Sequence, residues 1–93
     1  MIEKQIEHEL MKEVKARGGL CIKLVSPSMS GLPDRMVLMH GGNIGFVELK
    51  QRGKKPRALQ VRRIEQLQQL GFPCYIMDER EQIGDVLDAI CTS

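Results

Sequence analysis

Two acidic residues and a lysine are spaced along the chain so that their side chains could form a site for a divalent cation. Asp34 follows the tripeptide Gly31-Leu32-Pro33, and Glu48 comes after thirteen intervening residues, with Lys50 two positions beyond it. Side chains two apart on a strand share a face, so Glu48 and Lys50 are expected to point the same way. Carboxylates, waters and phosphate oxygens are the ligands that Mg²⁺ prefers. The set therefore indicates metal-assisted hydrolysis of a phosphodiester bond.

Each of these groups has a defined part in such a reaction. Asp34 and Glu48 would supply two oxygen ligands, and the backbone carbonyl of Leu49 could supply a third. Lys50 could orient or deprotonate the attacking water, or neutralise charge on the phosphate. The alternative is that Asp34 only forms a turn and that Glu48 and Lys50 line the wet face of a hairpin. Apolar neighbours argue against this alternative, because they mark a buried strand on which unpartnered charges would be costly: Phe46, Val47 and Leu49.

A run of basic residues follows the candidate site. Half of the lysines and arginines lie between positions 50 and 63, and no acid interrupts them. Neutralising backbone phosphates supplies most non-specific affinity for DNA, so the run is a candidate DNA contact; the alternative is a solvated face. Nearby hydroxyls could also bond phosphate oxygens, although serines in such loops often only form turns. The DNA-binding candidates are Ser26, Ser28, Ser30, Arg35, Arg52, Lys54, Lys55 and Arg57.

The periodicity of apolar residues predicts the elements that position these groups. Apolar residues recur every four positions from Ile2 to Val14, which is typical of an amphipathic helix ending before Gly18-Gly19. Pro56 suits the first turn of a second helix. Short apolar runs bounded by turn residues predict four strands. The predicted strands are 20–25, 36–39, 44–49 and 72–77, and the later helices are 56–70 and 81–90.

The order αβββαβα predicts an α/β fold with a mixed central sheet flanked by helices. The second and third strands are close enough to form a hairpin, which brings Asp34 beside Glu48. The last strand follows a helix, so it must cross over and pair in parallel with a neighbour. With 93 residues the chain has room for one domain, which we expect to span residues 1–93.

The composition favours a cytoplasmic protein. The N-terminus is charged from Glu3 onward, so no secretion signal is expected, and no apolar run approaches the roughly 18 residues of a membrane-spanning helix. Cys21, Cys74 and Cys91 are odd in number and lack CxxC spacing, so we expect reduced thiols rather than a zinc site. No organic cofactor is expected.

The motif resembles that of a known nuclease class. Pro33-Asp34 and Glu48-Leu49-Lys50 look like the PD-(D/E)XK signature, and the preceding Ser28-Met29-Ser30-Gly31-Leu32 resembles the VRR-NUC branch, the virus-type replication and repair nucleases. The resemblance covers nearly the whole chain. It implies a restriction-endonuclease-like core with Asp34 and Glu48 as metal ligands and Lys50 as the catalytic lysine. The expected location is the cytoplasm of a bacterial or virus-infected cell.

The resemblance also implies two further site residues. A glutamate on the first helix should lie near the metal, and Glu7 matches best, with Glu3 one turn earlier as the second candidate. A glutamine of the family matches Gln60, which we would otherwise assign to the surface. For either glutamate the alternative is a solvated helix acid.

We expect a structure-specific endonuclease that uses Mg²⁺ or Mn²⁺ and cuts branched DNA such as Holliday junctions. Only three aromatic residues are present, and no recognition helix is evident, which favours reading of DNA shape and backbone over base sequence. Two symmetric incisions in one junction imply a homodimer. The alternatives are a flap or nicking nuclease in a replication-repair complex, and a non-catalytic DNA-binding module. Metal titration separates the last alternative from the others.

Overall fold

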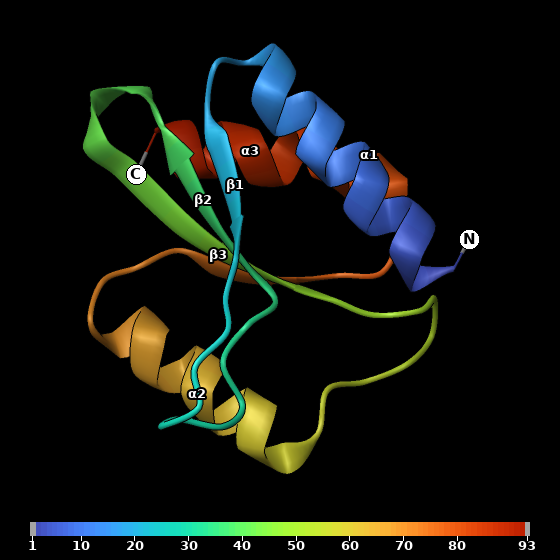
Figure 1. Ribbon diagram of the computed structural model, residues 1–93, viewed down its shortest axis with the longest axis vertical. Helices are drawn as coiled ribbons and strands as arrows, with labels where there is room; N and C mark the ends of the chain where they lie inside the picture. Colours follow the sequence, from blue (N-terminus) through green and yellow to red (C-terminus); the bar gives the residue numbers. More distant parts are fainter. Residues whose placement is uncertain (1, 93) are drawn as a thin grey trace.

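A computed structural model describes residues 2–92 and confirms the predicted order of helices and strands (Figure 1). The boundaries differ by a few residues, because the ends of several apolar runs lie in loops and a separate 3₁₀ turn, Arg80–Gln82, precedes α3. The elements are α1 (Glu3–Ala16), β1 (Leu20–Lys23), β2 (Arg35–Met39), β3 (Asn43–Leu49), α2 (Ala58–Gln69), β4 (Cys74–Met77) and α3 (Ile83–Cys91).

The four strands form one mixed sheet in the order β1-β2-β3-β4. The β1/β2 and β2/β3 pairs are antiparallel, and β4 joins β3 in parallel after the α2 crossover, as the sequence predicts. The turn between β2 and β3 is a 3₁₀ turn, His40–Gly42, in which both glycines have positive φ. This topology places the N-terminal end of β2 beside the C-terminal end of β3.

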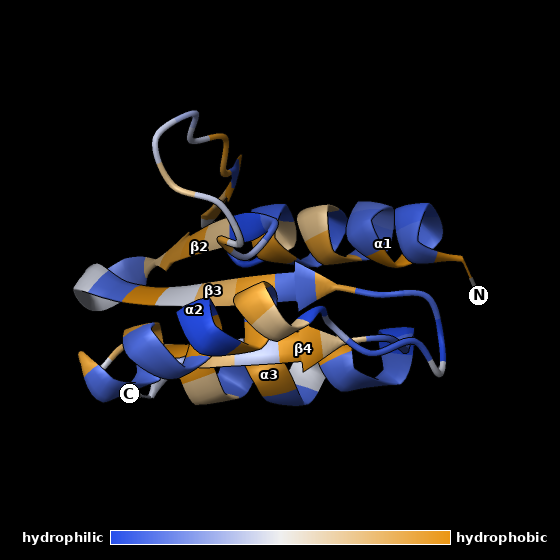
Figure 2. Cartoon of the chain, turned by 90° about the horizontal axis from the view of Figure 1, so that it is seen from below, coloured by the Kyte–Doolittle hydropathy of each residue, from blue (hydrophilic) through white to orange (hydrophobic). Residues whose placement is uncertain are grey.

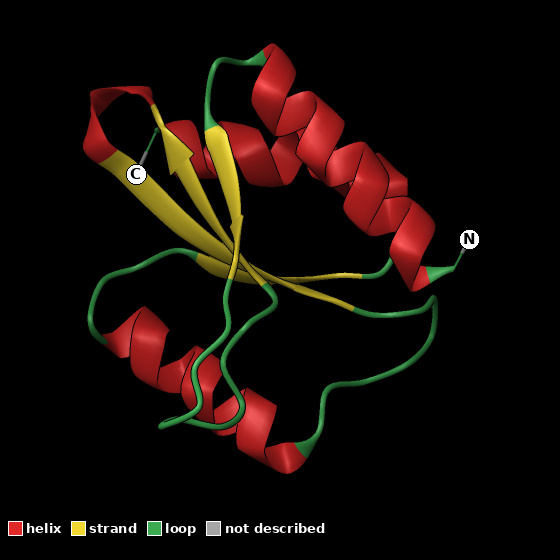
Figure 3. Ribbon diagram, in the orientation of Figure 1, coloured by secondary structure: helices red, strands yellow, loops and turns green. Residues whose placement is uncertain are grey.

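The helices cover opposite faces of the sheet. Figures 1 and 3 show α1 and α3 on one side and α2 on the other. The main core lies on the α1/α3 side. Figure 2 shows apolar residues, in orange, interspersed with polar ones along the helices and strands. A Cβ on Gly45 would lie 2.5 Å from two atoms of Ile90, so α3 crosses β3 with no room for a side chain. The buried core residues include Ile6, Leu10, Val14, Val37, Val47, Leu49, Met77, Leu87 and Ile90.

Within residues 2–92, no helix is long and apolar enough to cross a bilayer. The three cysteines are unpaired, and Cys74 is buried.

Candidate active site

The antiparallel pairing of β2 and β3 brings the two motif acids together at one end of the sheet. Arg35, the first residue of β2, pairs with Val47 of β3. Continuing this register by one residue sets Asp34 across from Glu48, so both side chains leave the same face of the sheet. Lys50 directly follows β3 and lies on the same face. Its Nζ is 3.1 Å from Oε2 of Glu48.

Glu48 is the most deeply buried charged group of the candidate site, with 1% of its surface exposed. Its Oε2 accepts a 2.7 Å hydrogen bond from Gln60 Nε2 and pairs with Lys50. Its Oε1 is buried and has no hydrogen-bond partner among the described residues. Burial raises the pKa of this carboxyl, the neighbouring charge of Asp34 adds to the increase, and Lys50 opposes it. The carboxylate is therefore short of positive charge and of donors.

Asp34 is anchored at the same sheet end by backbone groups. Its Oδ2 accepts the N–H of Leu49 at 2.9 Å, and its own carbonyl accepts the N–H of Leu24 at 2.9 Å. The N–H of Lys50 donates to the carbonyl of Met77 in β4. Because backbone groups of successive residues point to opposite edges of a strand, the N–H and C=O of Leu49 point away from β4, toward Asp34. The Leu49 carbonyl expected as a third oxygen ligand therefore emerges on the side where Asp34 lies.

Gln60 links the second helix to the candidate site. Its side chain is 8% exposed, although the sequence alone suggests a surface position. The amide oxygen accepts the backbone N–H of Arg57 at 2.9 Å, which caps α2, and the amide nitrogen donates to Glu48. One side chain thus stabilises the first turn of α2 and holds the buried carboxylate at once.

The structure does not gather the first-helix glutamate implied by the resemblance into this cluster. Glu7 Oε2 pairs at 2.8 Å with Nε of Arg35, and Nη1 of Arg35 donates to the Cys21 carbonyl at 3.4 Å. Arg35 alternates with Asp34 along the chain, so this pair lies on the α1 side of the sheet. Glu3 and Glu7 border a shallow hollow of about 410 Å³ on that side, together with Gln51. Within residues 2–92, no group of three acidic, histidine or cysteine side chains is placed to hold a metal ion.

Arg35 differs from its expected role as a DNA contact. Its side chain is only 11% exposed, because the guanidinium turns inward to Glu7. The loop serines are placed differently: Ser28 and Ser30 are exposed, and the Ser26 and Ser28 hydroxyls bond each other at 3.3 Å. Arg35 therefore has an internal partner, whereas the serines stay accessible near the site.

Most of the basic run lies in the exposed segment between β3 and α2, and its last two members, Arg62 and Arg63, lie within α2. Lys54, Lys55 and Arg57 are exposed, directly beyond the motif lysine. Arg52 is also exposed but pairs at 3.0 Å with Glu79 of the β4–α3 loop. The N–H of Gly53 bonds to Asp78 of the same loop at 3.3 Å, so these two acids anchor the basic segment. Sequence reasoning gave no signal for that anchor, because its partners are 25 or more residues apart.

Comparisons with known proteins relate the chain to nucleases. The chain is 39% identical over 88 residues to a protein described as "Putative nuclease p44" from Acyrthosiphon pisum secondary endosymbiont phage 1, covering 95% of this chain and 94% of the relative. A solved structure described as a VRR_NUC domain superposes with a TM-score of 0.86 and 29% identity, covering 92% and 94% of the two chains. No protein-family profile matches.

The mixed four-stranded sheet, with Pro-Asp and Glu-Leu-Lys at one end, has the core arrangement of the PD-(D/E)XK nuclease class. Within that class the chain belongs to the VRR-NUC family, as the resemblance in its sequence suggests.

Proposed function

We propose that this protein is a metal-dependent endonuclease that hydrolyses phosphodiester bonds in DNA. Its membership of the VRR-NUC family and its 39% identity to a phage protein described as a nuclease support the activity. The grouping of Asp34, Glu48 and Lys50 at one sheet end supports the location. The exposed basic segment directly after the motif strand supports DNA as the substrate.

One observation carries the metal assignment: Glu48 Oε1 is buried without a hydrogen-bond partner in the described chain. Leaving a buried acceptor unsatisfied costs about 1–3 kcal/mol, and more for a charged group. A bound cation would remove that cost, and the oxygens of Asp34, Glu48 and the Leu49 carbonyl suit Mg²⁺ or Mn²⁺. The residues present therefore fit the ion.

When bound, the ion would act as a Lewis acid on the phosphate and lower the pKa of a bound water. Lys50 keeps an ammonium group beside Glu48 with 18% of its side chain exposed, so it can donate to a phosphate oxygen or to the attacking water. Gln60 keeps the Glu48 carboxylate in one orientation. Lys54, Lys55 and Arg57 bind the flanking phosphates in this proposal and bring the scissile bond to the sheet end.

For the substrate we propose branched DNA, such as a four-way junction, cut by a homodimer. The domain offers an exposed basic segment and few aromatic side chains, which favours recognition of shape and backbone. Two paired incisions need two sites related by a two-fold axis, and such dimers are the commonest oligomers. Sedimentation velocity with and without junction DNA tests the dimer.

The test of the activity is a cleavage panel. Labelled junction, flap, fork and linear duplex substrates are incubated with Mg²⁺, Mn²⁺ or EDTA. We expect cutting that requires the metal and favours the junction, and no cutting by Asp34→Ala, Glu48→Ala or Lys50→Ala. Glu65→Ala, which removes an exposed acid from α2, serves as the control. Equal cutting in EDTA contradicts the metal dependence, and preference for flaps would favour the flap-nuclease alternative.

A further inference from the structure

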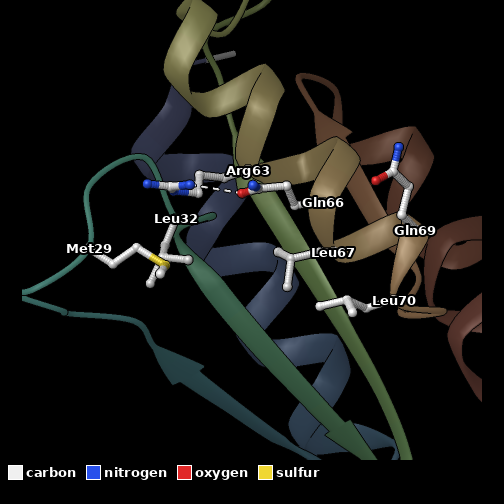
Figure 4. A pocket seen from close by; sticks show the side chains of 7 residues that line it. All are labelled: Met29, Leu32, Arg63, Gln66, Leu67, Gln69 and Leu70. Atoms are coloured by element: carbon white, nitrogen blue, oxygen red, sulfur yellow. Dashed lines mark hydrogen bonds between the residues drawn. The ribbon is translucent and has the colours of Figure 1, made fainter.

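Helix α2 contacts both chain segments that carry the candidate metal ligands. Gln60 bonds Glu48 of β3, as described above. One turn later, Arg63 Nε donates a 2.9 Å hydrogen bond to the backbone carbonyl of Ser30, in the loop that ends at Asp34. Figure 4 shows Arg63 extending from α2 toward this loop, near Met29 and Leu32. A single helix therefore contacts both segments through two successive turns, at the Glu48 carboxylate and at the Ser30 carbonyl four residues before Asp34.

The loop backbone lies directly against the same part of α2. Gly31 has φ +82°, and a Cβ there would lie 2.8 Å from Leu59 Cγ and 3.1 Å from the Leu59 carbonyl oxygen. It would also lie 3.2 Å from Arg63 Cγ. Only glycine accepts both the positive φ and the close approach. The contact at Gly31 and the hydrogen bond at Ser30 therefore fix adjacent residues of the loop on the helix.

A shift at this contact would reach Asp34 because the connecting segment is short and constrained. Three peptide steps separate Gly31 from Asp34, and Pro33 between them is fully buried, with the fixed φ of proline. The far end is held by the bonds of Asp34 to the N–H groups of Leu24 and Leu49. The loop has little freedom to absorb a displacement between its two anchors.

The guanidinium of Arg63 is itself oriented by a neighbour. Nη1 donates to Gln66 Oε1 at 2.8 Å (Figure 4). Together with the bond from Nε to the Ser30 carbonyl, this contact sets the plane of the guanidinium. Beside this bond lies an open apolar hollow of about 360 Å³, which separates the side chains of Met29 and Leu32 from the outer turns of α2. On this side of the loop, therefore, no tight apolar packing would hold the loop against α2 if the Arg63 bond were lost.

We propose that Arg63 is a positioning residue for the metal centre: by holding Ser30 it sets the place of Asp34 relative to Glu48. The proposal rests on the proposed function, because it assigns a metal ion to these two acids. It differs from the interpretation of the basic run as a uniform set of phosphate contacts, since it removes Arg63 from that set. Residues that orient metal ligands typically change metal affinity or activity by about 10–100-fold when substituted.

The test is calorimetric titration of Mn²⁺ into the metal-free full chain without DNA. Arg63→Ala should weaken Mn²⁺ binding about ten-fold or more, whereas Arg62→Ala, the matched control, removes the same charge from an exposed neighbour and should leave it unchanged. Arg63→Lys should recover part of the affinity, because an ammonium can donate to the same carbonyl. Gly31→Ala lifts the loop without changing charge and should weaken Mn²⁺ binding as Arg63→Ala does. Circular dichroism checks that each variant is folded.

The outcomes separate this proposal from the proposed function. Wild-type protein that binds no Mn²⁺ overturns both. Wild-type binding with unchanged affinity in folded Arg63→Ala overturns the positioning role alone. If Arg63→Ala does not fold, Gly31→Ala and Arg63→Lys decide: unchanged Mn²⁺ affinity in both overturns the proposal, and the expected graded loss supports it.

Discussion

Gln60 Nε2 donates a 2.7 Å hydrogen bond to Glu48 Oε2, and both side chains are buried between α2 and β3. The bond joins the helix that follows the basic segment to the strand that carries the motif. Because the amide oxygen of Gln60 accepts the N–H of Arg57 and so caps α2, the orientation of the carboxylate depends on the start of that helix.

Gln60→Ala should destabilise the protein and impair cleavage together. Loss of the amide leaves Glu48 with one donor fewer and uncaps α2, at a cost of about 1–3 kcal/mol in the free energy of unfolding. Cleavage of junction DNA should fall about 10–100-fold because the carboxylate is no longer held. Urea denaturation and single-turnover kinetics measure the two effects, with Gln69→Ala on the exposed end of α2 as control. Full activity in Gln60→Ala contradicts the role.

Glu48→Gln should stabilise the metal-free protein. Because the pKa of Glu48 is raised in the folded chain, the folded state loses stability as pH rises from the unfolded pKa through the folded one, and the loss persists at pH 7. Removing the charge should therefore raise the free energy of unfolding by about 1 kcal/mol. Urea denaturation in EDTA at pH 7 measures this difference.

Saturating Mg²⁺ should make the wild type more stable than Glu48→Gln, which reverses the order of stability in EDTA. Binding at 100 times the Kd stabilises the wild type by about 2.7 kcal/mol, and Glu48→Gln should gain far less. A variant stabilised by Mg²⁺ as much as the wild type would contradict Glu48 as the ligand, and a variant less stable than the wild type in EDTA would contradict the destabilising effect of its buried charge.

The buried thiol of Cys74 should make the folded state sensitive to alkali. Burial raises its pKa from 9.0 to about 12, with a smaller contribution from Glu48. The resulting stability is present below pH 9 and is lost toward pH 12, by at most about 1.4 kcal/mol per pH unit. Cys74→Val lacks this titration while keeping an apolar side chain. Unfolding curves measured from pH 8 to 11 should therefore diverge, and parallel curves would refute the assignment.

The exposed basic segment should dominate the salt dependence of DNA binding. Lys54→Ala, Lys55→Ala and Arg57→Ala should each weaken binding and reduce the slope of log K against log salt by about one. Arg52→Ala should have a smaller effect, because Arg52 already pairs with Glu79. Fluorescence anisotropy between 50 and 200 mM salt is suitable, with Lys12→Ala on α1 as control. Slopes that do not change would mean that the segment is only a solvated face.

The Glu7–Arg35 pair should stabilise the fold by linking α1 to the start of β2. Each single substitution by alanine should cost about 2 kcal/mol, and the double variant should cost no more than either one, since all remove one ion pair. The same variants test the first-helix metal ligand implied by the family resemblance. Weaker Mn²⁺ binding in Glu7→Ala with unchanged binding in Arg35→Ala would identify Glu7 as a ligand, whereas equal effects would indicate a shared structural role.

Much of the fold follows from local features of the chain. The four-residue apolar spacing around Leu10 and the turn glycines at 41 and 42 predict a helix and a hairpin directly. Because side chains alternate along a strand, Glu48 and Lys50 had to share a face once β3 was recognised, and the hairpin register then set Asp34 opposite. These relationships depend on periodicity and on near neighbours, which the sequence contains.

Only the tertiary structure decided which distant groups pair. Glu7 pairs with Arg35, Arg52 pairs with Glu79, and Arg63 donates to the Ser30 carbonyl. From the sequence, Glu7 was a candidate metal ligand, and the three arginines were candidate phosphate contacts. The burial of Gln60 likewise depends on how α2 lies across β3. The physical reason is that a long polar side chain bonds whatever its packed neighbours bring within about 3 Å, and helix packing sets those neighbours.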